Sequence, residues 1–319
     1  MKKLLVLLIS VVFVSCSQDQ VESTNPVVET SLSVLDGKLL SYKDEKSFVK
    51  EYSDLSKMNS SELQKWISDK KLNSLLNSSS DSLVMQEENL SNSRIIYSDA
   101  MKAILNNESK VKIGSNTLWI NEHILYALSN ENSDKAPKEL IVMKNCLEVY
   151  GKLLNYSDLK GNVNSNLIGR LVVPNENGIK TYVVGLPNSN RYVLDLFNET
   201  IVLNGLIYSS KMYLRYTLQY RSCSFWRCTW KTDTTQRWNM YGYNLLSTGS
   251  GSQVGYWIFT PPQAEFVVGP QTLLLATWGV NGPVDPIYYQ YPNFGVSGNA
   301  IWRYYSSPIE YPQAISWYN

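Results

Sequence analysis

Residues 211–238 read KMYLRYTLQYRSCSFWRCTWKTDTTQRW, and this stretch decides the fold of the second half of the chain. From Met212 to Tyr220, apolar residues alternate with a row that contains Arg215, Thr217 and Gln219. A period of two is typical of a half-buried antiparallel strand with one apolar and one polar face. We therefore expect a β-strand here.

Two cysteines follow this strand, five positions apart, at Cys223 and Cys228. On one straight strand they would lie ~16 Å apart and face opposite sides, which a disulfide cannot bridge. A disulfide therefore requires a turn at 224–227, and it can persist in an exported protein. A zinc site would need further Cys or His ligands that the neighbouring sequence lacks, and the spacing is not C-x-x-C. The turn would leave Phe225 and Trp226 at its tip.

A second turn is expected at 233–235, which would make a three-stranded meander with Trp230 facing Trp238 as a cross-strand pair. The candidate ligand-binding residues are thus Phe225, Trp226, Trp230 and Trp238. Seven of the nine tryptophans lie between Trp226 and Trp317. Rigid aromatic rings suit stacking on sugars or partner proteins, but they also fill the cores of β domains, so both roles stay open.

The sequence predicts an α+β fold in two parts. Residues 161–319 consist of short β-type runs between turn residues, which favours an aromatic-rich, antiparallel all-β domain of the sandwich type. Residues 32–160 are more charged and helix-periodic, and they predict a small N-terminal α+β domain.

Local patterns define the elements of the N-terminal part. Asp36-Gly37 and Gly114-Ser115 predict hairpin turns between short apolar runs. A helix that Asp44 could cap, and a second one starting near Asn59, should follow the first hairpin. Apolar residues at helical spacing after Pro137 predict a further helix up to 154, with Cys146 beside its apolar face as a buried thiol.

The N-terminus begins MKKLLVLLISVVFVSCSQDQ, in which two lysines precede an apolar run that is too short to span a bilayer. This layout is typical of a bacterial signal peptide, here residues 1–15. Val14, Ser15 and Cys16 resemble a lipoprotein lipobox, which implies that Cys16 becomes the acylated N-terminus and a membrane anchor. The alternative is cleavage without lipidation, which yields a soluble secreted protein. Residues 16–31 are polar and should form a flexible tether.

The segments DGKLLSYKDEKSFVKEYSDLSKMNSSELQKWI (36–67) and AILNNESKVKIGSNTLWI (103–120) resemble uncharacterised Bacteroidota-type outer-membrane lipoproteins. The resemblance lies mainly in residues 1–125 and carries no catalytic motif. It implies a location in the outer membrane, often facing outward.

Several function classes have little support. A net charge of +1 gives no electrostatic footprint for nucleic acid. His123 is the single histidine, so a two-histidine metal site is excluded and a catalytic triad would depend on this residue alone. The acids after residue 200 are Asp233, Glu265, Asp285 and Glu310, and their spacing singles out no glycosidase pair.

We therefore predict a non-catalytic envelope lipoprotein without cofactor or metal, whose β domain binds a glycan or a protein. The alternative is a structural lipoprotein of the outer membrane with no ligand of its own. A glycan-processing hydrolase ranks third.

Overall fold

The computed structural model describes residues 31–78, 96–154, 180–186, 189–233, 238–250, 257–259, 264–267, 270–278, 283–285, 293–304 and 308–318. Leu32–Asn319 form one compact unit, separate from Met1–Ser31. The predicted signal peptide and Cys16 lie outside the described residues. Within the described part, no helix has the length and apolar character needed to cross a membrane.

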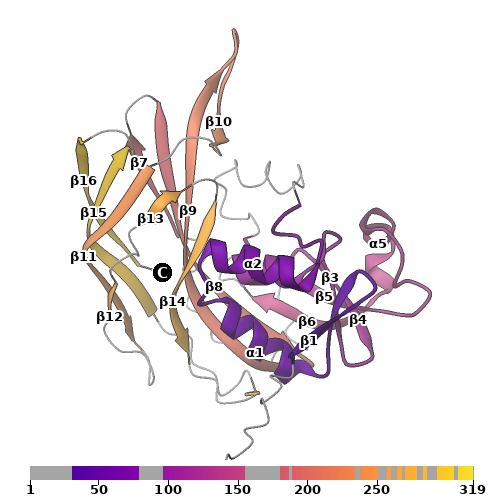
Figure 1. The fold of residues 1–319 in the computed structure, drawn as a ribbon. Coiled ribbons are helices and arrows are strands. Elements are labelled where there is room, and N and C mark those ends of the chain that lie inside the picture. Colours follow the sequence, from indigo (N-terminus) through magenta and orange to yellow (C-terminus); the bar gives the residue numbers. More distant parts are fainter. Residues whose placement is uncertain are drawn as a thin grey trace, which may run out of the picture. The chain divides into compact units, whose positions relative to one another are not determined.

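The fold is α+β and mostly β, and its described residues form two sheets and a few helices (Figure 1). The helices among them are α1 Glu45–Leu55, α2 Ser60–Lys70, α4 Asp99–Ile104, α5 Pro137–Met143 and the 3-10 helix η1 Lys144–Cys146. The larger sheet contains β1 Ser33–Asp36, β2 Leu39–Tyr42, β3 Lys110–Ile113, β4 Asn116–Asn121, β5 Ile124–Leu128, β6 Glu148–Leu154, β7 Lys180–Leu186, β8 Asn190–Leu203, β9 Leu206–Cys223, β10 Cys228–Thr232 and β14 Gln271–Trp278. The smaller sheet contains β11 Trp238–Ser250, β12 Trp257–Phe259, β13 Ala264–Val267, β15 Asn293–Tyr304 and β16 Glu310–Tyr318.

The larger sheet has the strand order β1-β2-β3-β4-β5-β6-β8-β9-β10, while β7 pairs with β8 and β14 with β9. It is a mixed sheet, because β2 and β3 are parallel whereas the other described pairs are antiparallel. The predicted boundary at 160/161 falls in 155–179, outside the described residues. The sheet takes strands from both sides of that boundary, since β6 pairs with β8.

The first two helices form where the sequence predicts them. The Asp44 side chain accepts a hydrogen bond from the backbone N–H of Ser47 at 2.8 Å, which caps α1. Asn59 and Glu62 form a capping box at the start of α2. The apolar stripe of α1, which includes Phe48, is buried in the main hydrophobic core.

The two predicted N-terminal hairpin turns are also confirmed. β1 and β2 pair around Gly37, which has a φ of +62°, and β3 and β4 pair around Gly114 at +59°. Glycine suits both positions because a left-handed backbone is costly for residues with a Cβ.

The long helix predicted after Pro137 is wrong beyond Met143. The chain continues through η1 into β6, which pairs with both β5 and β8. Backbone hydrogen bonds to β5 and β8 stabilise this segment as a strand, although the spacing of its apolar residues predicts a helix. Cys146 is exposed, not buried as predicted.

β8 and β9 form the long central hairpin of the larger sheet. Asn204 and Gly205 make its two-residue turn, and both have positive φ. The alternation predicted for β9 is present, but its polar row is buried as well as its apolar row. Arg215 is 1% exposed, Thr217 is 3% exposed and Gln219 is fully buried. The strand is therefore covered on both faces, not half-buried as expected.

Candidate functional site

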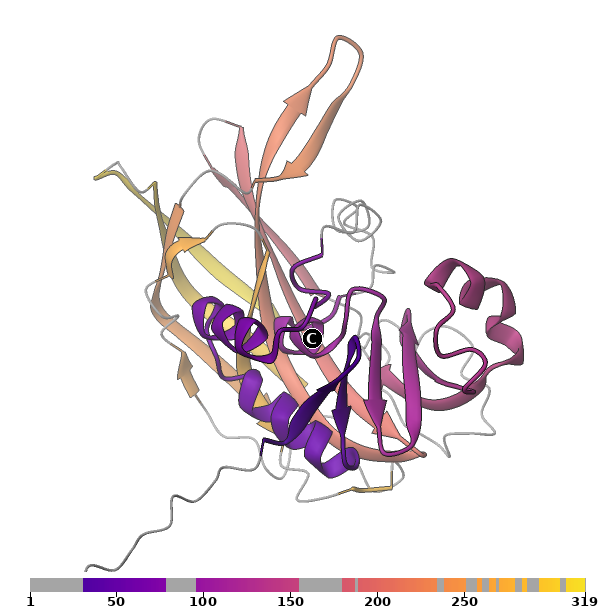
Figure 2. The same cartoon turned by 45° about the vertical axis from the view of Figure 1, so that its right-hand side comes forward.

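The β9–β10 hairpin extends beyond the neighbouring strand β8. β8 begins at Asn190, which lies opposite Tyr220. The Arg221 N–H donates to the Ser189 carbonyl oxygen at 2.9 Å, and from Ser222 onward β9 pairs only with β10 in the described part of the chain. Trp230 lies opposite Arg221. Figures 1 and 2 show this end of the hairpin projecting past β8. Its tip is thus open to solvent.

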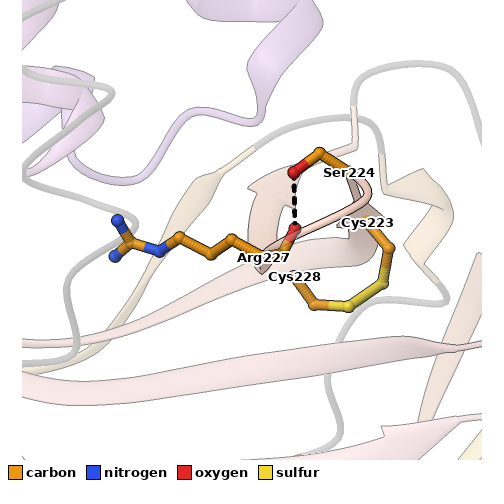
Figure 3. Close-up of a disulfide and its surroundings, with 4 residues drawn as sticks. All are labelled: Cys223, Ser224, Arg227 and Cys228. Carbon is orange, nitrogen blue, oxygen red and sulfur yellow. Dashed lines mark hydrogen bonds between the residues drawn. A yellow bond between two sulfur atoms is a disulfide. The ribbon is translucent and has the colours of Figure 1, made fainter.

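A disulfide closes the tip of the hairpin. Cys223 and Cys228 are bonded and lie opposite each other in the strand register. Inside this loop, the Ser224 N–H and Oγ–H both donate to the Arg227 carbonyl oxygen, at 2.8 and 3.0 Å. Figure 3 shows the Arg227 side chain pointing away from the disulfide. The predicted turn and disulfide are both present.

Two aromatic rings stand at this tip. Phe225 is 89% exposed and Trp226 is 90% exposed, the two highest values among the exposed large hydrophobic side chains of the described residues. Their centroids lie 4.7 Å apart with an interplanar angle of 83°, an edge-to-face pair. Large apolar groups held in water on a closed turn are typical of a contact surface.

The hairpin also carries basic side chains. Arg221, Arg227 and Lys231 are exposed. At its base, the Arg191 guanidinium lies 4.1 Å from the centre of the half-buried Trp230 ring, and its Nε–H donates to Gln219 Oε1 at 2.8 Å. Partial burial lowers the pKa of Arg191 from its usual value. This cation–π pair could not be predicted from the sequence, because β8 and β10 come close only through their shared neighbour β9 in the sheet.

Trp238 does not join this cluster, so the predicted three-stranded meander is wrong. Trp230 pairs with Arg221, whereas Trp238 pairs with Tyr304 and Val267 in the smaller sheet. The predicted second turn lies largely in 234–237, outside the described residues. Without a glycine or Asn-Gly turn to impose a tight hairpin, the chain can leave the larger sheet here.

A second polar cluster lies inside the unit and was not expected from the sequence. Glu199 on β8 accepts hydrogen bonds from Tyr52 Oη at 2.6 Å and from the Ser98 N–H and Oγ at 2.9 and 2.6 Å. The Tyr52 and Tyr213 hydroxyls are 2.9 Å apart. Burial raises the pKa of Glu199. We call these four residues the Glu199 cluster, and they connect α1, α4, β8 and β9.

Lys211 extends the polar interior beside this cluster. Its Nζ donates to Ser53 Oγ at 3.1 Å and to Thr277 Oγ1 at 3.0 Å. Burial lowers its pKa to about 8. At the start of α4, the Asp99 carboxylate accepts a hydrogen bond from the Thr272 N–H at 2.8 Å. The Asp99 backbone N–H donates to Thr272 Oγ1, also at 2.8 Å. These contacts join α1 and the start of α4 to β9 and β14.

The residues considered for catalysis come from different parts of the chain. Asp233 is buried at the end of β10, whereas Asp285 and Glu310 are exposed. The side chain of Glu265 lies outside the described ones. His123 is in the turn between β4 and β5, far from the hairpin in the sequence. Among the described residues, no three His, Cys, Asp or Glu side chains form a group that could hold a metal ion.

Comparisons with known proteins give little further information. No protein-family model matches the chain, and no curated protein does. Among solved structures, the chain is similar to the crystal structure of a DUF4848 family protein from Bacteroides thetaiotaomicron. That match has 12% sequence identity and a TM-score of 0.21, and it covers 89% of this chain and 98% of that one. The chain thus has a weak resemblance to a Bacteroidota protein from a family of unknown function.

Proposed function

We propose that this protein is a non-catalytic lipoprotein of the bacterial cell envelope that binds a glycan or protein ligand through the tip of the β9–β10 hairpin. Its membrane partner would be the outer membrane, reached through acyl chains on Cys16, with the binding domain displayed at the cell surface. The proposal assigns no cofactor, metal or nucleic acid to the chain.

The observation that carries the proposal is the exposure of Phe225 and Trp226 on a turn closed by a disulfide. Covering two such rings removes on the order of 300–500 Å² from water, worth roughly 8–12 kcal/mol of transfer free energy. Association itself costs an estimated ~4–15 kcal/mol, so the rings could anchor a ligand but would need further contacts for high affinity. The closed turn limits the entropy lost when they bind.

The binding experiment uses the full chain with Cys16→Ala, to avoid lipidation, and titrates it calorimetrically with a panel of soluble polysaccharides. We expect heat with at least one polysaccharide and its loss in the double variant Phe225→Ala, Trp226→Ala. Val142→Ala is the matched control, because Val142 is an apolar side chain on α5 that is 87% exposed. Absence of heat with every polysaccharide would remove the glycan version of the proposal.

The membrane anchor has its own test. Radiolabelled palmitate should label the wild-type protein expressed in a bacterial host that processes lipoproteins, and it should not label Cys16→Ala. Unlabelled wild-type protein would reject the anchor and favour secretion in soluble form.

A structural lipoprotein without a ligand is the second candidate, because other aromatic side chains are used for packing. Trp119 is 1% exposed and stacks on Tyr126, and Phe197 stacks on Tyr213 inside the core.

We also propose that the two sheets pack as a sandwich. The hydrogen bond from Tyr182 Oη on β7 to the Ala314 carbonyl on β16, at 2.8 Å, supports this arrangement. A hydrolase remains the third candidate.

A further inference from the structure

We propose that the ligand of the β9–β10 hairpin is an acidic glycan, a polysaccharide whose sugar units carry carboxylate or sulfate groups. This inference rests on the proposed function, because it takes the hairpin as the binding element, and it goes further by naming the charge of the ligand.

The β9–β10 hairpin exposes positive charge. The exposed charged side chains between β9 residue 219 and β10 residue 232 are all basic, namely Arg221, Arg227 and Lys231. Within the described part of the chain, neither these three nor Arg191 takes part in an ion pair. The acid that follows the hairpin, Asp233, is buried at 3% exposure, so no exposed carboxylate lies between residues 219 and 233. The hairpin therefore offers unneutralised positive charge to a ligand although the whole chain has a net charge of only +1.

The same hairpin carries aromatic rings beside these cations. Trp226 lies in the turn at the tip, and Trp230 lies on β10 two residues after Cys228. Arg227 lies between them in the chain, and Arg221 lies opposite Trp230 in the register. Rings can stack on the apolar faces of sugar units, while guanidinium groups can pair with carboxylates or sulfates in bidentate geometry. A linear acidic polymer laid along the hairpin would meet both kinds of group.

Basic and aromatic side chains also bind lipid surfaces, but the open edge of β10 favours a glycan as the ligand. β10 is an edge strand of the larger sheet among the described residues, so the backbone groups on its outer side face no other described strand. Hydroxyl side chains at Ser224 and Thr229 accompany the rings. Open strand edges are not tolerated in hydrocarbon, whereas the hydroxyls of a hydrated sugar chain can pair with them.

The experiment titrates the full chain carrying Cys16→Ala with two acidic probes, polygalacturonate and chondroitin sulfate. Fully methyl-esterified polygalacturonate serves as the neutral probe of matched backbone. We expect the acidic form to bind at least about tenfold more tightly than its ester, and we expect its affinity to fall as salt rises. Trp226→Ala and Arg227→Ala should each weaken binding about tenfold, as truncation of an interface anchor does. Lys138→Ala, which removes an exposed cation on α5, should have no effect.

The outcomes separate this inference from the proposed function. Equal binding of polygalacturonate and its ester would overturn the acidic ligand while leaving a glycan-binding function intact. Absence of binding to all three polysaccharides would overturn the acidic ligand, whereas the glycan-binding function would still be decided by the calorimetric panel. Binding instead to vesicles of 70% phosphatidylcholine and 30% phosphatidylglycerol, with the same dependence on Trp226 and Arg227, would overturn it in favour of a lipid surface. Both variants replace exposed side chains, and an unchanged circular dichroism spectrum would show that they fold.

Discussion

The Glu199 cluster makes a sharp prediction about stability. Tyr52→Phe removes only a hydroxyl, yet that hydroxyl donates to Glu199 at 2.6 Å and lies 2.9 Å from the Tyr213 hydroxyl. Tyr52 and Glu199 are both 0% exposed, so water cannot replace the lost partner. Hydrogen bonds to charged groups contribute ~1.5–3 kcal/mol, and after the substitution Glu199 would keep only its hydrogen bonds from Ser98. We expect the free energy of unfolding to fall by about 2–3 kcal/mol.

The protein offers a matched control at the surface. Tyr150 Oη donates to Glu45 Oε1 at 2.5 Å, which is the same chemistry, but both side chains are only half-buried. Tyr150→Phe should therefore cost less than about 1 kcal/mol, because water can solvate the Glu45 carboxylate once the hydroxyl is gone. The contrast between the two variants isolates the effect of burial.

Urea denaturation followed by circular dichroism would measure both losses, with thermal melts as a second readout. A loss of 2–3 kcal/mol corresponds to a decrease in melting temperature of roughly 3–5 °C for a folded unit of this size. A double-mutant cycle of Tyr52→Phe with Tyr213→Phe should give a coupling energy of about 1 kcal/mol or more, because the two hydroxyls share one network. Equal losses for Tyr52→Phe and Tyr150→Phe would refute the reasoning that burial sets the energy of this cluster.

Two further predictions concern the sheet interior. Gly151→Ala should lower the free energy of unfolding by about 1–3 kcal/mol, because a Cβ at this position would clash with the Val202 carbonyl oxygen. Gly185→Ala is the control, because a Cβ there would meet nothing within 4 Å. In the same urea titration it should be neutral or slightly stabilising. The pKa of Lys211 is lowered to about 8 in the folded protein, against about 10.4 for an unfolded lysine. Folding therefore favours the neutral form of Lys211. Its contribution to the free energy of unfolding is complete above pH ~10.4 and is lost as the pH falls through about 8. Lys211→Met should abolish this rise in stability with pH, and an unchanged pH slope would contradict the assignment.

The turn at 224–227 was predictable on the condition that the two cysteines are bonded. Two cysteines five residues apart can bond only if the chain reverses between them. That reversal alone places the intervening Phe225 and Trp226 at a tip. The register of Trp238 could not be predicted in the same way, because no covalent bond and no glycine constrains its segment. Its partners Tyr304 and Val267 come from distant parts of the chain.

By itself, the sequence determined the features that depend on a few neighbouring residues. These are the caps at Asp44 and Asn59, the glycine turns, the strand period of β9 and the bonded turn at its end. Each follows from steric or hydrogen-bonding constraints within one or two turns of chain, so no tertiary contact is needed to specify it.

Only the tertiary structure decided which faces and segments would meet. The polar row of β9 is buried because the sheet is covered on both faces, and Tyr52 reaches Glu199 across a sequence separation of 147 residues. The segment 148–154 became a strand instead of a helix because β5 and β8 supply backbone partners on both sides. Arg191 likewise lies over Trp230 only because β8, β9 and β10 are neighbours. Periodicity reports the local conformation of a segment, whereas the identity of its partners depends on non-local pairing that a single sequence does not record.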